Sequence, residues 1–135
     1  MKRIRVMVVD DSLQFASAVG QFLACKGNFE VLASANSGSE ALARASAERP
    51  DLMFIDISMP GMNGLAVTSL IKGREAAPKI VMMTLEDSEE HRIGAIAAGA
   101  DAFLSKDNFA HGFHTVLESL FATSSVHMES QAWDG

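Results

Sequence analysis

The chain has 135 residues, which is enough to bury one hydrophobic core and too few for two. Its hydrophobic share of 48% is ordinary for a globular protein, and no apolar stretch approaches the roughly 18 residues of a membrane span. The formal net charge is −6 and the chain has no run of basic residues. These two features argue against binding of a nucleic-acid phosphate backbone as the main activity of the chain.

The chain opens on a basic start followed by an apolar segment, residues 4–9, which predicts a strand. This segment runs directly into Asp10-Asp11 without the small-residue cleavage site of a signal peptide, so we expect a cytoplasmic protein. Ser12 is then placed to cap a helix that extends to about residue 26. Five apolar residues recur at helical spacing and predict its buried face: Leu13, Ala16, Val19, Phe22 and Leu23.

The next segments repeat this alternation of strand and helix. The lone cysteine, Cys25, falls among apolar residues of the first helix, where we expect a buried or half-buried side chain rather than a nucleophile. Residues 29–33 predict a second strand. Ser37 and Glu40 stand at the spacing of a capping box, which predicts the start of a second helix. Residues 52–56 predict the third strand.

The second half of the chain continues the pattern. We expect a loop over 57–63, a helix over 64–72 and a strand over 79–84. Residues 87–90 have the form of another capping box and open a helix that Gly99 is placed to end in the left-handed conformation. Four apolar residues recur along this helix at helical spacing: Ile93, Ile96, Ala97 and Ala100. Its charged segment 89–92 is interpreted as a solvated face.

A fifth short strand is expected over 102–104, before a final helix. The inner stripe of that helix is predicted to contain Phe109, Phe113, Val116, Leu117 and Leu120. His111 and His114 share one face of it, but no cysteine or acidic ligand accompanies them, so we interpret them as structural rather than metal-binding. After residue 123 the chain turns polar, and residues 124–135 are interpreted as a tail or linker.

Strict alternation of apolar strands with helices predicts an α/β domain with a parallel sheet covered on both faces. In such a sheet, ligands bind where the carboxyl ends of the strands meet. Five polar residues follow or end four different strands: Asp10, Asp11, Asp56, Thr84 and Lys106. We therefore expect three carboxylates, one hydroxyl and one ammonium group to converge at one edge.

The chemistry of this set suits transfer of a phosphoryl group. Three close carboxylates repel one another, and a hard divalent cation such as Mg²⁺ relieves that repulsion. A carboxylate can also act as a nucleophile and form an aspartyl phosphate. The lysine, the hydroxyl and the metal ion can then stabilise charge on the transferring group.

Four short motifs occupy the ends of the predicted strands. They are VVDDS at 8–12, DISMPGMNG at 56–64, MT at 83–84 and GADAFLSK at 99–106. In this order and spacing they resemble the receiver domains of two-component response regulators, over residues 2 to about 123. The resemblance implies a receiver domain over 1–123. It also implies a flavodoxin-like (βα)5 doubly wound sandwich, whose five-stranded parallel sheet has the order 2-1-3-4-5.

The resemblance also implies a role for each of the acidic residues. Asp56 matches the phosphoacceptor, and Asp11 the direct Mg²⁺ ligand. Asp10 matches a neighbouring residue that acts on the metal mainly through water. The backbone carbonyl of Ser58 matches a further metal ligand, and Lys106 matches the lysine that pairs with the phosphoryl group.

Other positions that match the family concern the conformational switch and the reaction rates of the domain. Thr84 matches the switch hydroxyl, and Phe103 matches the aromatic residue that turns inward when Thr84 is drawn to the phosphoryl group. Ser58 and Glu86 occupy the two positions that tune reaction rates in the family. Leu85, directly after Thr84, is bulkier than the small residue that the family often has at that position, and we predict that it narrows access to the phosphorus atom.

The sequence departs from the family pattern after Lys106, where Asp107 replaces a common proline. We therefore expect a trans peptide or a less constrained loop there. The motifs look most like receivers that precede a helix-turn-helix output domain, which these 135 residues do not contain. The resemblance implies a histidine kinase or histidine phosphotransfer protein as phosphoryl donor. It also implies an output partner or DNA-binding domain, and makes a homodimer through the fourth and fifth helices plausible.

Three other functions compete with this interpretation. A phosphatase with an aspartyl nucleophile usually carries a second acid two residues on, where this chain has Ser58. A flavodoxin-like cofactor binder needs a phosphate loop after the first strand, where Asp10-Asp11 would repel phosphate. A receiver-shaped module that has lost phosphorylation is disfavoured because all five key side chains are present. We therefore expect a signalling domain that catalyses only its own phosphorylation and dephosphorylation.

Overall fold

The structure is a computed structural model, and it describes residues 3–59, 61 and 63–121. Its strands are β1 (Ile4–Val9), β2 (Phe29–Val31), β3 (Leu52–Asp56), β4 (Lys79–Thr84) and β5 (Ala102–Ser105). Its helices are α1 (Leu13–Ala24), α2 (Gly38–Glu48), α3 (Gly64–Lys72), α4 (Glu89–Ala98) and α5 (Phe109–Phe121), with a short 3-10 helix, η1 (Lys106–Asn108). The predicted tail over 124–135 lies outside the described residues.

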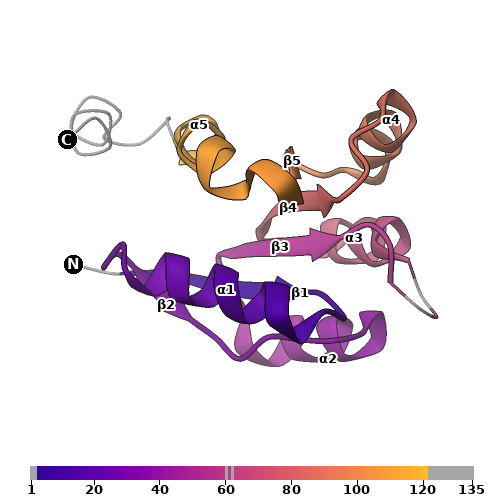
Figure 1. Ribbon diagram of the computed structural model, residues 1–135. Coiled ribbons are helices and arrows are strands. Elements are labelled where there is room, and N and C mark those ends of the chain that lie inside the picture. The colour runs from indigo at the N-terminus through magenta and orange to yellow at the C-terminus, as the bar shows by residue number, and fades with distance from the viewer. Residues whose placement is uncertain (1–2, 60, 62, 122–135) are drawn as a thin grey trace.

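The strands form one parallel sheet in the order β2-β1-β3-β4-β5, which confirms the predicted doubly wound, flavodoxin-like fold (Figure 1). The chain passes from β1 to β2 at one edge and then crosses back to β3 on the other side of β1. The strand order therefore reverses beside β1. The carboxyl ends of β1 and β3 lie together at this reversal, where such sheets place their ligands.

Two hydrophobic clusters cover the two faces of the sheet. Successive side chains of a strand point to opposite faces, so Val6 and Val8 of β1 pack toward α1 and α5. Met7 and Val9 of the same strand pack toward α2, α3 and α4. The central strands are buried on both faces, which is why they read as continuous apolar runs in the sequence.

Hydrogen bonds at the helix ends explain where several helices start and stop. The hydroxyls of Ser12, Ser37 and Ser88 each accept a backbone N–H from the first turn of α1, α2 and α4. Glu40 completes the predicted capping box by accepting the N–H of Asn36. Gly99 ends α4 with a φ of 97°, as its position predicted.

The structure corrects two predictions about α1. Leu13 is 67% exposed, although its spacing placed it on the buried face, because it is the first residue of α1 and the residues that pack into the core lie further along the helix. Cys25 is exposed rather than buried, because α1 ends at Ala24 and the cysteine lies at the C-cap. The buried residues of this helix are Ala16, Val19 and Leu23.

Smaller differences occur elsewhere in the chain. The strand β2 ends at Val31, two residues earlier than predicted, and β5 extends one residue further, to Ser105. Ile93 and Ile96 lie in α4 as predicted, but their side chains are 61% and 74% exposed. Within the part of the chain that the structure describes, no helix is both long and apolar enough to cross a membrane.

Candidate functional site

The carboxyl edge of the sheet brings together side chains from widely separated motifs. Asp10 follows β1 and is fully buried, and Asp56 ends β3 with only 5% of its surface exposed. Lys106 follows β5, and its Nζ lies 2.7 Å from Oδ2 of Asp10 and 3.2 Å from Oδ2 of Asp56. The register of the sheet therefore places one ammonium group between two buried carboxylates.

A hollow of about 370 Å³ opens beside this cluster. Its lining contains Asp11, Ser12, Asp56, Ser58, Thr84, Leu85, Glu86, His91 and Lys106. Seven of these nine residues had been singled out from the sequence as site or rate-tuning residues. The hollow thus gives a small molecule or a transferring group access to the carboxylate of Asp56.

The two buried carboxylates are each fixed by a tight turn. Oδ1 of Asp10 accepts the backbone N–H of Ser12 at 2.8 Å, and Oδ1 of Asp56 accepts the N–H of Ser58 at 3.1 Å. In both cases the carboxylate binds the backbone two residues further on, as aspartates in turns commonly do. Both Oδ2 atoms are left facing Lys106.

Burial and charge act in opposite directions on these groups. Burial raises the pKa of Asp56, and the nearby charge of Asp10 adds to this, while Lys106 and the N–H of Ser58 offset only part of the rise. Burial alone would lower the pKa of Lys106, but its pairing with Asp10 and Asp56 leaves that pKa raised. Lys106 is therefore held as a cation against two acidic groups.

The acidic residues fit a divalent cation. Asp10, Asp11 and Asp56 each offer an oxygen atom, and these atoms lie within 4.8 Å of one another. Oδ2 of Asp10 is buried without accepting an aligned hydrogen bond, although Lys106 Nζ lies close by. All the ligand atoms that these residues offer are oxygens, and one of them is a buried carboxylate oxygen that accepts no hydrogen bond. Mg²⁺ prefers ligands of this kind.

Thr84 ends β4 beside this cluster and is almost fully buried. Its Oγ1 accepts the backbone N–H of Glu86 at 3.1 Å and lies 3.3 Å from the carbonyl oxygen of the same residue. Nδ1 of His91 lies 2.7 Å from that carbonyl oxygen and 3.5 Å from Thr84 Oγ1. The threonine hydroxyl is thus bound to the start of the β4–α4 connection.

Of the two remaining predicted positions, Leu85 lines the hollow and Phe103 does not. Phe103 in β5 is half-buried and packs against the cluster beneath α2, α3 and α4, and the guanidinium of Arg92 lies 4.9 Å from its ring centre. Leu85 is 67% exposed and contributes to the lining of the hollow. The peptide bond between Lys106 and Asp107 is trans, as the missing proline predicted.

The comparison with known families decides what kind of domain this is. The sequence pattern of the response regulator receiver domain matches residues 6–118, which is most of the chain. The chain belongs to this family. It is thus a receiver domain of the two-component response regulators.

Known proteins similar to this receiver differ in what they do. A protein-glutamate methylesterase/protein-glutamine glutaminase of Geobacillus kaustophilus is 37% identical over 107 residues, covering 78% of this chain and 31% of that protein. The response regulator protein VraR of Staphylococcus aureus is 34% identical over 109 residues, covering 79% of this chain and 51% of that protein. The chain therefore spans about a third to a half of the length of these relatives.

A solved structure gives the same fold. The response regulator domain of Thermotoga maritima CheB is 28% identical to this receiver, with a TM-score of 0.77. The similarity covers 88% of this chain and 94% of that chain. The match is thus between whole receiver domains.

Two residues beside the receiver's site were given no role from the sequence. A Cβ on Gly64 would lie 2.0 Å from the backbone oxygen of Asp56, so only glycine fits where α3 starts against the end of β3. His91 is half-buried and turned toward Thr84, although the charged segment around it was interpreted as a solvated face. Gly64 closes the motif at 56–64, but its contact with Asp56 and the approach of His91 to Thr84 depend on how α3 and α4 pack beside the sheet, which the motif itself does not show.

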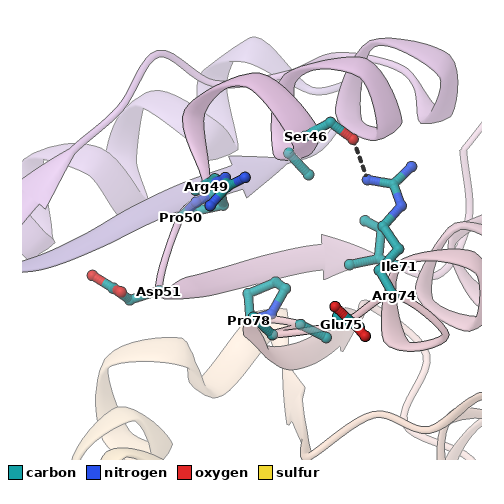
Figure 2. Close-up of a pocket in the computed structure, with 11 residues that line it drawn as sticks. Ser46, Arg49, Pro50, Asp51, Ile71, Arg74, Glu75 and Pro78 are labelled. Atoms are coloured by element: carbon teal, nitrogen blue, oxygen red, sulfur yellow. Dashed lines mark hydrogen bonds between the residues drawn. The ribbon is translucent and has the colours of Figure 1, made fainter.

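A larger hollow, of about 490 Å³, lies at the opposite edge of the receiver's sheet, between α2 and the loop before β4 (Figure 2). None of the predicted site residues lines it. Its charged lining is mixed, with Arg49 and Arg74 beside Asp51 and Glu75. Figure 2 shows Arg74 reaching Ser46, whose hydroxyl accepts its guanidinium N–H at 2.7 Å. We therefore place the chemistry at the smaller, carboxyl-edge hollow.

Proposed function

We propose that this receiver accepts a phosphoryl group on Asp56 in a Mg²⁺-dependent reaction and changes conformation in response. The observation that supports this most is the placement of Lys106 between two buried carboxylates beside the hollow. Burial raises the pKa of Asp56, so its ionised form is poorly solvated and lies next to a fixed cation. Such a carboxylate is suited to act as a nucleophile.

Asp11, Asp10, Asp56 and the carbonyl of Ser58 would hold the metal ion. When bound, Mg²⁺ neutralises charge on the phosphoryl oxygens and on the acidic cluster. One carboxylate oxygen of Asp56 forms a bond to phosphorus while the bond between phosphorus and the donor's leaving atom breaks. Lys106 then pairs with a phosphoryl oxygen, because the carboxylate of Asp56 loses its negative charge when it is phosphorylated.

Thr84 and Phe103 carry the response to phosphorylation in this proposal. A phosphoryl group adds roughly 1.5 to 2 negative charges and three acceptor oxygens beside Thr84. Thr84 turns its hydroxyl from the Glu86 backbone toward one of them, and Phe103 turns inward behind it. This movement reshapes the surface formed by α4, β5 and α5.

Ser58, Leu85 and Glu86 set the rates of the reaction. All three line the hollow through which a water molecule must reach the phosphorus atom. Leu85 narrows that access with an apolar side chain. The domain catalyses only its own phosphorylation and dephosphorylation, since the position two residues after Asp56 is Ser58 and supplies no second acid for a foreign phosphoester.

The partners follow from the same proposal. A histidine kinase or a histidine phosphotransfer protein supplies the phosphoryl group to the receiver domain, residues 1–123. The response is passed to an output partner or to an attached DNA-binding domain, and the acidic receiver itself does not bind nucleic acid. A homodimer forms through α4 and α5. The cytoplasmic location stays a prediction.

Incubation with acetyl phosphate tests the proposed chemistry. Wild-type protein and Asp56→Asn are treated with and without Mg²⁺, and the intact mass of each is recorded. We expect a gain of one phosphoryl group that needs both Mg²⁺ and Asp56. Turnover of a stable phosphoester, or an equal gain in the Asp56→Asn variant, would contradict the proposal.

A further inference from the structure

The backbone of Glu86 is the centre of a small hydrogen-bonded cluster beside the hollow. Nδ1 of His91 lies 2.7 Å from the carbonyl oxygen of Glu86. A carbonyl oxygen only accepts, so Nδ1 must carry the proton of this bond. The N–H of Glu86 donates in turn to Oγ1 of Thr84 at 3.1 Å. We call these three residues the Thr84–Glu86–His91 cluster.

His91 is held in this cluster by the first turn of α4. Its backbone N–H donates to the capping hydroxyl of Ser88 at 3.1 Å, which fixes the helix start next to the β4–α4 connection. Its side chain is half-buried and lines the same hollow as Asp56. The ring therefore joins the helix start to the loop that carries Glu86.

The cluster uses both functions of the Thr84 hydroxyl. The oxygen accepts from the Glu86 N–H, and the proton faces the Glu86 carbonyl oxygen at 3.3 Å. Among the described residues, no hydrogen bond joins Thr84 to Asp56. For Thr84 to donate to a group on Asp56, it must leave the Glu86 backbone. Any contact that fixes that backbone therefore favours the resting position of the hydroxyl.

We propose that His91 is a positioning residue that stabilises the resting conformation of Thr84 by holding the carbonyl of Glu86. This proposal rests on the proposed function, because it assigns His91 a part in the switch of the phosphorylated receiver. A contact made only in the resting state lowers the apparent affinity for any ligand that selects the switched state. Removal of the His91 contact must then raise that affinity.

Beryllofluoride, which mimics a phosphoryl group on a carboxylate, provides the probe. Its apparent affinity in the presence of Mg²⁺ is measured by calorimetry for wild type, His91→Ala, His91→Gln and His91→Asn. The amide N–H of asparagine occupies the place of Nδ1, whereas that of glutamine extends to the place of Nε2. We expect wild-type affinity for His91→Asn, and about fivefold tighter binding for His91→Ala and His91→Gln, since one net hydrogen bond is lost from the resting state.

A second comparison separates a switch role from a merely structural one. His91→Ala is repeated in a Thr84→Ala background, where we expect its effect on beryllofluoride affinity to disappear. His111→Ala, at an exposed position on α5, is the matched control and should leave the affinity unchanged. Thermal melts confirm that each variant is folded.

The outcomes distinguish this proposal from the proposed function. Equal affinities in wild type, His91→Ala and His91→Gln would overturn the role of His91 and leave the phosphoacceptor assignment standing. An effect of His91→Ala that persists in the Thr84→Ala background would also overturn it. Folded wild-type protein that binds Mg²⁺ but no beryllofluoride would overturn both.

Discussion

In the folded protein without metal, the burial of Asp56 and the negative charge of its carboxylate oppose each other. Its carboxylate is almost fully buried, and only part of the cost of that burial is offset by Lys106 and the N–H of Ser58. Asp10 lies on the other side of the same lysine and adds a second negative charge. The site is therefore built for a cation and a phosphoryl group at the expense of the stability of the metal-free protein.

The stability of the metal-free protein should depend on pH through Asp56. Because its pKa is raised in the fold, the folded protein keeps a proton where the unfolded chain, with an aspartate pKa of about 3.9, has lost it. The free energy of unfolding therefore falls as pH rises through the raised pKa. We expect Asp56→Asn to melt at a higher temperature than wild type in EDTA at pH 7.

The pH series supplies the control for this prediction. The difference in melting temperature between Asp56→Asn and wild type should shrink as the pH is lowered below the folded pKa, where Asp56 is neutral. A difference that is the same at every pH would show that the substitution acts through packing rather than charge. Equal melting temperatures at pH 7 would contradict the predicted cost of the carboxylate.

Leu85 should set the lifetime of the aspartyl phosphate. Its side chain is 67% exposed but contributes to the lining of the hollow, so it can obstruct a water molecule without supporting the core. We expect Leu85→Ala to hydrolyse the phosphoryl group faster than wild type, with little change in melting temperature. The decay of phosphorylated protein after removal of the donor measures this, and an unchanged lifetime would count against the predicted obstruction.

At the residue scale, the sequence predicts groups that lie at strand ends better than groups placed by tertiary contact. Asp10, Asp56 and Lys106 meet because parallel strands end at one edge, and that edge follows from the alternation of strands and helices. Gly64 and His91 depend on how α3 and α4 approach β3 and β4. No spacing in the sequence reports those approaches.

At the scale of elements, the start of α3 against the end of β3 is the tightest approach beside the site. The backbone N–H of Gly64 donates to the carbonyl of Ile57 at 2.8 Å, and an added Cβ would meet the backbone of Asp56. Backbone atoms cannot move aside as a flexible side chain can. The position of the helix α3 is therefore coupled to the position of Asp56.

Gly64→Ala should destabilise the protein by about 2–3 kcal/mol, since the methyl group forces α3 away from β3. Gly73→Ala is the matched control at the other end of α3, where a Cβ would approach nothing closer than 3.5 Å and φ is −77°. We expect that variant to be neutral or slightly more stable. Urea unfolding of both variants compares them, and equal stabilities would refute the close approach.

The sequence predicts most element bounds because turn residues separate the elements and a side-chain cap starts four of the helices, with a serine hydroxyl at α1, α2 and α4 and the amide oxygen of Asn63 at α3. The strands β3 and β4 have the predicted bounds. Apart from the small shifts at the ends of β2 and β5, the errors concern burial: Leu13 and Cys25 were expected to be at least partly buried but are exposed. Ile93 and Ile96 have the predicted helical spacing, yet they are 61% and 74% exposed. Periodicity shows which residues share a helix face, but the tertiary packing decides how far that face is covered.

At the scale of the whole molecule, the exposed isoleucines of α4 are suited to the proposed dimer. Ile93 and Ile96 are 61% and 74% exposed. We expect gel filtration with Mg²⁺ and beryllofluoride to shift wild type toward a dimer, and Ile96→Glu to remain a monomer. Leu13→Glu, at a 67% exposed position on α1, is the control and should still dimerise. Identical elution of wild type with and without beryllofluoride would contradict the dimer.

In the proposed reaction the phosphoryl group is carried by Asp56 and not by the neighbouring acidic residues. Phosphorylated protein treated with borohydride has its acyl phosphate reduced to homoserine, and peptide mass spectrometry then locates the converted residue. We predict homoserine at position 56 alone, with Asp10 and Asp11 unchanged and no conversion when Mg²⁺ is omitted. Conversion at Asp10 or Asp11, or a phosphoryl group retained elsewhere with Asp56 intact, would contradict it.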